Sequence, residues 1–279
     1  MAFVVDGNPG EFEPDVYISQ LLDDHYKWVK LTLDFLHKSF SDGISEGHDL
    51  DVYISQLLDD HYKWVKLTLD FLLLGCGPTV HCVLSASRVY TNITMADLSV
   101  KNLDAVRHWL DPETDTDLGM WQPVLQHVAQ LEGYRDGVLG AEDIARRARR
   151  CVRHLVQCDV LRDPILPLPC HSYDCVLTSL CLEAAVSDLV SYRKVLRNVV
   201  QYVRPGGTFI MIGVLGCRSY VVGERTFPSL SLTQRDVRDA IALAGVVRCN
   251  WHMVEKWNSA EDVNGNGWTG AFMVKGVCG

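Results

Sequence analysis

The sequence predicts an α/β protein built on a doubly wound, mainly parallel sheet of seven strands, with a helical region before it. Two observations lead to this fold class. From Leu73 onward, short apolar runs alternate with stretches of helical periodicity, which is the pattern of βα units. The first run passes into a tight turn, Gly75–Gly77, and an acid, Asp97, ends the next run. With 48% hydrophobic and 22% charged residues, the chain has a globular composition.

The helical region before the sheet contains a duplication. Asp15–Leu36 and Asp51–Leu72 are the same stretch, DVYISQLLDDHYKWVKLTLDFL. Repeat architectures need about three units to bury a continuous core, so two copies indicate a duplication within one region. Each copy is predicted to be an amphipathic helix, because apolar residues recur near helical spacing, in the first copy at Ile18, Leu21, Leu22, Val29, Leu33 and Leu36. We therefore divide the chain into an N-terminal helical region, 1–71, and a sheet domain, 72–279.

The second copy interrupts what reads as a single strand. Without it, Asp51-Val52 would lead directly into Leu72 and the glycine turn. A local conflict of this kind opposes folding. We therefore expect a chain without Tyr53–Phe71 to keep or gain stability.

Seven apolar runs have the length and composition of strands. They are Leu72–Leu74, Asn92–Ala96, Leu155–Cys158, Tyr173–Thr178, Thr208–Val214, Arg248–Val254 and Ala271–Lys275. The turn residues Arg204–Gly207 are predicted to end a helix, Ser191–Val203, and to lead into the fifth strand. Because no Gly, Ser or Pro linker separates two bodies, we expect one domain with N-terminal additions.

Charge and cysteine content exclude several classes of function. The formal net charge of −9 disfavours binding to nucleic acid or to a membrane surface. None of the ten cysteines lies in a C-x-x-C motif, which indicates reduced thiols, a cytoplasmic protein and no metal site. The one basic run, Arg146–Arg153, is interpreted as a solvated helix face, and Cys181 as a small buried residue.

The glycine turn and the acid after it indicate a nucleotide-like ligand. Asp97 follows Gly75 at close to the ~20-residue spacing at which an acid reaches ribose hydroxyls in doubly wound folds. A dinucleotide fingerprint would place a third glycine where this chain has Val80, so NAD is the weaker interpretation. Asp97 also suits the N-cap of a helix, and the two roles are compatible.

Several motifs in order resemble the S-adenosylmethionine-dependent methyltransferases, and within them the nicotinamide, phenylethanolamine and indolethylamine N-methyltransferases. The resemblance runs from about Leu72 to the C-terminus. It is carried by Gly75-Cys-Gly-Pro-Thr79, Ile93-Thr-Met-Ala-Asp97, Cys158-Asp-Val160, Asp174-Cys-Val-Leu-Thr-Ser-Leu-Cys-Leu-Glu183 and Tyr220-Val-Val-Gly-Glu224. It implies a Rossmann-like methyltransferase fold with an N-terminal helical lid, and S-adenosyl-L-methionine as cofactor, with S-adenosyl-L-homocysteine as product.

The resemblance also assigns cofactor-binding residues. It implies that Gly75, Gly77 and Ser179 border the methionine part, and that Asp97 and Asn102 hold the ribose. Asp159, between Cys158 and Val160, would face the adenine. Phe12-x-Pro14-x-x-Tyr17 resembles the lid motif of the family, whose tyrosine closes over the cofactor; Tyr53 in the second copy lacks the preceding Phe and Pro. The family has an aromatic residue where this chain has His81, and an Asp where it has Leu73.

On the acceptor side, the resemblance implies that Glu183 and Tyr220 act at the reacting amine and that Ser229 helps to bind it. The carboxylate of nicotinamide-specific members corresponds to Gly213, and a second lid tyrosine to Leu22. The tail Asn264–Gly267 lacks the second acid of phenylethanolamine-type members. The expected function is N-methylation of a small amine or pyridine-type acceptor by a monomer. A non-catalytic cofactor-binding or interaction protein and an NAD-linked oxidoreductase are the alternatives.

Overall fold

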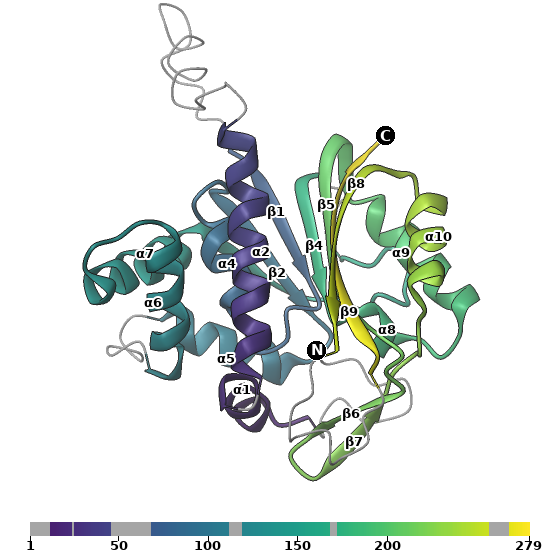
Figure 1. Ribbon diagram of the computed structural model, residues 1–279, viewed down its shortest axis with the longest axis horizontal. Coiled ribbons are helices and arrows are strands. Elements are labelled where there is room, and N and C mark those ends of the chain that lie inside the picture. Colours follow the sequence, from purple (N-terminus) through teal and green to yellow (C-terminus); the bar gives the residue numbers. More distant parts are fainter. Residues whose placement is uncertain (1–11, 24, 46–67, 112–118, 168–171, 257–267) are drawn as a thin grey trace, which may run out of the picture.

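The computed structural model describes residues 12–23, 25–45, 68–111, 119–167, 172–256 and 268–279 (Figure 1). Most of the second copy, including Tyr53, and the tail Asn264–Gly267 lie outside these residues. None of the described helices has the length and apolar character that crossing a membrane requires.

The described strands form one large sheet and one hairpin. The sheet has seven strands in the order β3-β2-β1-β4-β5-β9-β8. The strands β1 to β5 pair in parallel with one another, and β9 is antiparallel to both β5 and β8. Their bounds are β1 Asp70–Leu74, β2 Asn92–Asp97, β3 Val152–Gln157, β4 Tyr173–Ser179, β5 Val203–Leu215, β8 Val246–Glu255 and β9 Gly270–Cys278, with the hairpin made of β6 Ser219–Val222 and β7 Arg225–Pro228. The predicted fold class is confirmed.

Helices cover both faces of the sheet (Figure 1). On one face lie α2 (Tyr26–Ser45), α4 (His81–Ala86), α6 (Gln122–Leu131) and α7 (Gly137–Cys151). On the other lie α8 (Leu182–Ala185), α9 (Leu189–Val200) and α10 (Gln234–Leu243). The remaining helices are α1 (Pro14–Asp23), α5 (Val100–Leu110) and the short 3-10 turn η2 (Gly119–Trp121).

The apolar run of β1 supplies both cores. Successive side chains of a strand point to opposite faces of the sheet. Accordingly Phe71 and Leu73 pack with the α2 side, whereas Leu72 and Leu74 pack with the α9 side. A strand that is buried on both faces is expected to be apolar at every position, and the last four residues of β1 are at most 1% exposed.

The first copy of the duplicated segment forms two helices rather than one. The apolar positions predicted for it are largely correct, since Ile18, Leu21, Val29, Leu33 and Leu36 are all buried. However, α1 ends at Asp23 and α2 begins at Tyr26. The first copy is therefore helical, as predicted, but it forms two helices, α1 and α2, where one was expected.

One tripeptide adopts two different structures. Asp34-Phe35-Leu36 lies within α2, and the identical Asp70-Phe71-Leu72 of the second copy forms the start of β1. In β1, the backbone N–H of Asp70 donates to the Asp174 carboxylate at 2.7 Å, and the side-chain amide of Asn92 donates to the Asp70 carboxylate. The second copy therefore supplies the replacement strand, and neighbouring strands, not local propensity, decide the conformation.

The turn Arg204–Gly207 differs from its prediction. It does not separate helix from strand but lies inside β5, where pairing passes from Tyr173↔Val203 to Cys175↔Thr208. Gly206 has a φ of 76°, a conformation that suits glycine, so the residues form an irregularity that bends the strand.

We predict that a chain lacking Tyr53–Phe71 and carrying Val52→Phe will unfold at the same temperature as the intact chain or at a higher one. The junction then reads Leu-Asp-Phe-Leu-Leu-Leu, the sequence from Leu69 to Leu74, so β1 is restored letter for letter. The stretch of chain between α2 and β1 also becomes shorter, which lowers the entropy cost of bringing its ends together. Thermal unfolding followed by circular dichroism is the measurement.

The simple deletion is the matched control, because it places Val52 where Phe71 stands. The sequence alone led us to expect this deletion to keep or gain stability, and the burial of Phe71 revises that expectation. Phe71 is fully buried, with ring centroids 6.0 Å from Phe40 and 5.1 Å from Tyr90. Its loss should cost on the order of 2 kcal/mol in the deletion and equally in Phe71→Val of the intact chain. A restored variant that does not fold would show that residues 53–69 are part of the core.

Candidate functional site

The glycine turn lies at the carboxyl end of β1, where crevices form in doubly wound sheets. Gly75 and Gly77 have positive φ values of 70° and 58°, which L-amino acids with a side chain rarely adopt. The N–H groups of Gly75 and Cys76 donate to the carbonyl of Ala96 at 2.8 and 3.0 Å. The predicted turn is therefore held against the end of β2 by two backbone hydrogen bonds.

Asp97 connects this turn to the next helix. Its Oδ2 accepts from the Gly77 N–H at 2.8 Å. Its Oδ1 accepts from the Ser99 N–H at 2.9 Å and from the Asn102 side chain at 3.0 Å. The carboxyl has no exposed surface, and burial raises its pKa although these hydrogen bonds act in the opposite direction. The N-cap of α5 is Ser99, not Asp97, so Asp97 is fixed in place without being a cap.

The residues after β3 lie next to Asp97. The Cys158 N–H donates to the Asp97 carbonyl at 2.9 Å, and both Cys158 and Val160 are buried. Asp159 accepts from the N–H of Leu161 at 2.9 Å and lies 3.4 Å from Arg162. The structure thus brings the predicted ribose and adenine residues to one edge of the sheet, with Asp159 supported by its own turn.

Tyr17 of α1 closes a small cavity beside the glycine turn. The cavity measures about 20 Å³, close to the space of one water molecule. Four predicted residues line it, Tyr17, Gly75, His81 and Ser179, and Leu73 stands where the family has an acid. Ligand sites usually measure several hundred Å³, so this cavity is much smaller than a bound cofactor would require. Sequence reasoning missed the remaining lining residues: Leu21, Trp28, Cys76, Thr79, Cys82 and Leu180.

Leu180 has a strained backbone, with a φ of 51° in a residue that is not glycine. Such strain costs about 1–3 kcal/mol and concentrates at functional sites. The Leu180 N–H donates to the Ile212 carbonyl at 2.8 Å, which holds the turn after Ser179 against β5. An apolar residue carries no sequence signal for this role.

His81 is a neutral, buried ring at this cavity. Burial lowers its pKa to about 4, so it is uncharged at neutral pH. The ring stacks on Trp121 at 6.3 Å, and Nε2 lies 3.3 Å from the Cys82 sulfur. Its Nδ1 has no protein partner and remains available to a ligand.

The residues predicted to bind the acceptor include Glu183 on α8 and Tyr220 on β6. Glu183, at the start of α8, is 1% exposed, and burial raises its pKa to about 7. Its Oε1 accepts a weak bond from the Val214 N–H at 3.4 Å, whereas Oε2 has no partner. The hydroxyl of Tyr220 is also buried without a partner. Unpaired buried polar atoms are costly, so these two are candidates for contact with a substrate.

Neighbouring side chains occupy the space that a side chain at Gly213 would need. A Cβ at this position would lie 2.7 Å from the Phe272 ring and 3.2 Å from Oε1 of Glu183. Ser229 lies just after the hairpin, where its N–H donates to the Arg218 carbonyl at 2.8 Å. The carboxylate that the resemblance would place at position 213 is therefore absent, and Glu183 is the carboxylate next to that position.

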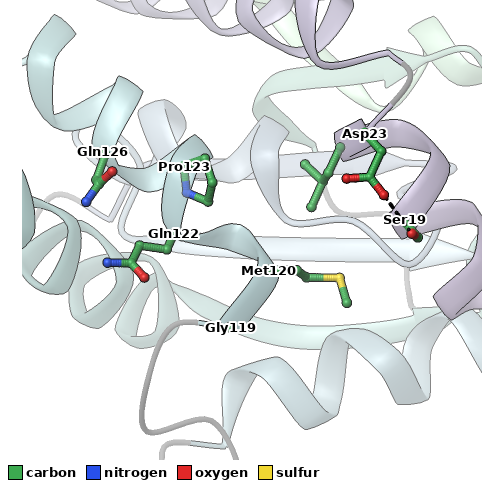
Figure 2. Close-up of a pocket in the computed structure, with 8 residues that line it drawn as sticks. Ser19, Asp23, Gly119, Met120, Gln122, Pro123 and Gln126 are labelled. Atoms are coloured by element: carbon green, nitrogen blue, oxygen red, sulfur yellow. Dashed lines mark hydrogen bonds between the residues drawn. The ribbon is translucent and has the colours of Figure 1, made fainter.

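A larger, open cavity of about 530 Å³ lies between α1 and the start of α6 (Figure 2). None of the predicted binding residues lines it. Leu22 does, although it stands where the family has a second lid tyrosine, so that position faces away from the small cavity. Ser19 donates to Asp23 at 3.0 Å along one wall.

The remaining charged and thiol groups have structural roles. Arg147 makes a two-pronged contact with Glu132, at 2.6 and 2.8 Å, and Arg149 lies over the Trp109 ring. The basic run is thus only partly a solvated face. Cys181 is buried, as predicted, and burial raises its thiol pKa. Within the described ranges, no three His, Cys, Asp or Glu side chains gather as metal ligands.

The residues present suit S-adenosylmethionine. Positive-φ glycines permit close approach, Asp97 retains acceptor capacity on Oδ2, and the buried Asn102 oxygen and His81 Nδ1 await partners. A sheet in this order, with its glycine turn bound to an acid on β2, defines an S-adenosylmethionine-dependent methyltransferase.

Sequence comparison narrows this class. The model of the NNMT/PNMT/TEMT family matches residues 20–274, and the chain belongs to this family. It is 34% identical to nicotinamide N-methyltransferase of Sus scrofa over 70% of this chain and 72% of that protein. It is 36% identical to nicotinamide N-methyltransferase of Homo sapiens, over 62% of this chain and 64% of that protein. Identity to indolethylamine N-methyltransferase of Oryctolagus cuniculus is 31%, over 78% and 73%.

Asp97→Ala is expected to weaken binding of S-adenosylhomocysteine by roughly 1.5–3 kcal/mol, because hydrogen bonds to a charged acceptor are lost. Asp97→Asn retains one acceptor oxygen and should lose less. Calorimetric titration measures both. Equal affinity in Asp97→Ala and the unchanged chain would remove Asp97 from the ribose site.

Tyr17→Phe is expected to raise the Michaelis constant for S-adenosylmethionine, whereas Tyr53→Phe should leave it unchanged. Tyr17 is the one tyrosine among the described residues that lines the small cavity. It also follows Phe12 and Pro14, whereas Tyr53 does not follow such a pair. Because the two tyrosines occupy the same position in the duplicated stretch, each variant controls for the other. Similar effects at both positions would contradict a single lid.

Glu183→Gln is expected to stabilise the ligand-free protein at pH 8 by about 3 kcal/mol and to have little effect at pH 4.5. The pKa of Glu183 is raised in the folded state, so stability is present at low pH and lost as pH rises through about 7. Glutamine removes that buried charge. Urea unfolding across this pH range is the measurement, and parallel curves for both proteins would be the contrary result.

Proposed function

We propose that this protein transfers a methyl group from S-adenosylmethionine to the nitrogen of a small amine or pyridine-type acceptor. The observation that carries the proposal is the buried Glu183 carboxyl, whose Oε2 has no partner in the protein. A carboxylate in such a place is stable only when a ligand supplies a donor or a positive charge. The Tyr220 hydroxyl, also buried and unpaired, is the second such group.

The cofactor would lie along the carboxyl edge of β1, β2 and β3. When bound, S-adenosylmethionine supplies an electrophilic methyl group on a sulfonium centre. The carboxylate of Asp97, held by Gly77, Ser99 and Asn102, would accept from the ribose hydroxyls. Ser179 and His81 would border the methionine end, and Tyr17 would exclude water above it. Positioning of this kind can contribute on the order of 7 kcal/mol or more to lowering the barrier.

Glu183 and Tyr220 would act on the acceptor. The nitrogen must present its lone pair, so an ammonium has to lose a proton first, and a pKa of about 7 suits Glu183 for receiving it through water. A pyridine-type nitrogen needs no base. Where Glu183 is ionised, as with a pyridine-type acceptor or after the received proton has passed on to solvent, its carboxylate would stabilise the positive charge that develops on the acceptor, and the Tyr220 hydroxyl would orient the group.

Family membership favours methyl transfer over both alternatives, a non-catalytic protein and an NAD-linked oxidoreductase. The position of Gly213 favours amines over nicotinamide. The acid of nicotinamide-specific members is absent there, and Phe272 and Glu183 adjoin the place it would take.

The proposal is tested by methyl transfer from labelled S-adenosylmethionine to nicotinamide, an indolethylamine and phenylethanolamine, the acceptors for which the relatives are named. We expect turnover with at least one amine and a loss of activity in Glu183→Gln and Tyr220→Phe. Cofactor binding without transfer to any acceptor would indicate the non-catalytic alternative.

A further inference from the structure

The lid helix α1 is joined to the β6–β7 hairpin, although the two are some two hundred residues apart in sequence. The N–H of Gly223, at the tip of the hairpin, donates to Oε1 of Gln20 at 2.9 Å. Gly223 has a φ of 60°, and a Cβ there would lie 3.2 Å from the Val16 side chain. The tip thus fits closely against one side of α1, at the end of the sheet where both elements lie (Figure 1).

Each of the two elements covers one half of the site. Tyr17 of α1 lines the cavity beside Gly75 and Ser179. The hairpin carries Tyr220, and the chain just after it is tied to Glu183, because the Leu230 N–H donates to the Glu183 carbonyl at 2.7 Å. The chain at the base of the hairpin is therefore bound to the backbone of Glu183, and the tip of the hairpin is bound to α1.

Aromatic rings fill the space between the two elements. Phe12 lies 5.3 Å from Tyr17 and 6.0 Å from Phe227, and Tyr220 stacks on Phe227 at 5.3 Å. Phe12, Val222 and Phe227 are buried together as a separate small core. This core has one contributor before α1 and two on the hairpin, so it is complete only when both elements are in place.

We propose that Gln20 couples the hairpin to the lid helix, so that closure of α1 over the cofactor also positions Tyr220 at the acceptor. Gln20 acts through Gly223 and is a positioning residue. The apolar contacts bring the two elements together without a fixed register, whereas the directional Gln20 hydrogen bond sets the height of the hairpin along α1. The inference rests on the proposed function, because it assumes that a cofactor binds beneath Tyr17.

The test is amide hydrogen exchange of the hairpin peptide Ser219–Pro228, measured with and without S-adenosylhomocysteine at saturation. In the unchanged protein, ligand should slow exchange of this peptide although the ligand does not touch it. In Gln20→Ala, calorimetry should show that S-adenosylhomocysteine still binds, while the protection of the hairpin falls about five-fold, as expected for the loss of one hydrogen bond.

Two variants control the experiment. Gln20→Glu keeps a side-chain oxygen of the same length and should restore the protection. Gln56→Ala makes the same change in the same local sequence of the second copy and should have no effect. Exchange in α9, on the far face of the sheet, should be equal in all variants, which separates loss of coupling from general destabilisation.

Hairpin protection that is the same in Gln20→Ala and the unchanged protein would overturn the coupling while leaving cofactor binding intact. Absence of any ligand-induced protection in the unchanged protein would overturn it as well. If S-adenosylhomocysteine does not bind the unchanged protein at all, the proposed function fails first, and the inference falls with it.

Discussion

The hydrogen bonds of one buried carboxylate hold the functional edge of this protein together. Asp97 accepts from the glycine turn after β1, from the N-cap of α5 and from the Asn102 side chain within that helix. Its backbone carbonyl also receives the chain that leaves β3. Removal from water opposes ionisation of this carboxyl and raises its pKa, and the three hydrogen bonds to its side-chain oxygens offset part of that effect. The glycine turn, helix α5 and the segment Cys158–Val160 are therefore all bound to Asp97.

Glu183, the carboxyl proposed to face the acceptor, differs from Asp97 because one of its oxygens has no partner in the protein. Asp97 is satisfied by protein donors, whereas Glu183 is left with one oxygen unpaired and a pKa near neutrality. A satisfied acid gives a fixed frame, and an unsatisfied acid gives a strong preference for a ligand that brings hydrogen-bond donors. In the proposed function, Asp97 would hold the cofactor and Glu183 would select the acceptor.

Much of this site could be predicted from the sequence, and what was missed has a physical reason. Gly75, Gly77 and Asp97 were predictable because their roles depend on backbone freedom and on spacing between two consecutive strands. Tyr17 was found through its neighbours Phe12 and Pro14. Leu180 was missed because strain in φ leaves no mark on residue type. The hairpin and the Gln20 contact were missed because the partners are distant in the chain, and β1 was placed two residues late because Asp70-Phe71 also reads as helix.

The tripeptide shared by α2 and β1 has a consequence for how the chain folds. Both copies carry the same apolar side chains, so in the unfolded chain both compete for the groove that α2 fills in the native state. When the first copy occupies that groove, Asp70-Phe71-Leu72 remain free to pair with β2 and β4. When the second copy occupies it, the same residues are drawn into a helix, and the central strand loses most of its length. We expect a chain in that arrangement to unfold locally before the sheet can close, so the duplication is expected to slow folding.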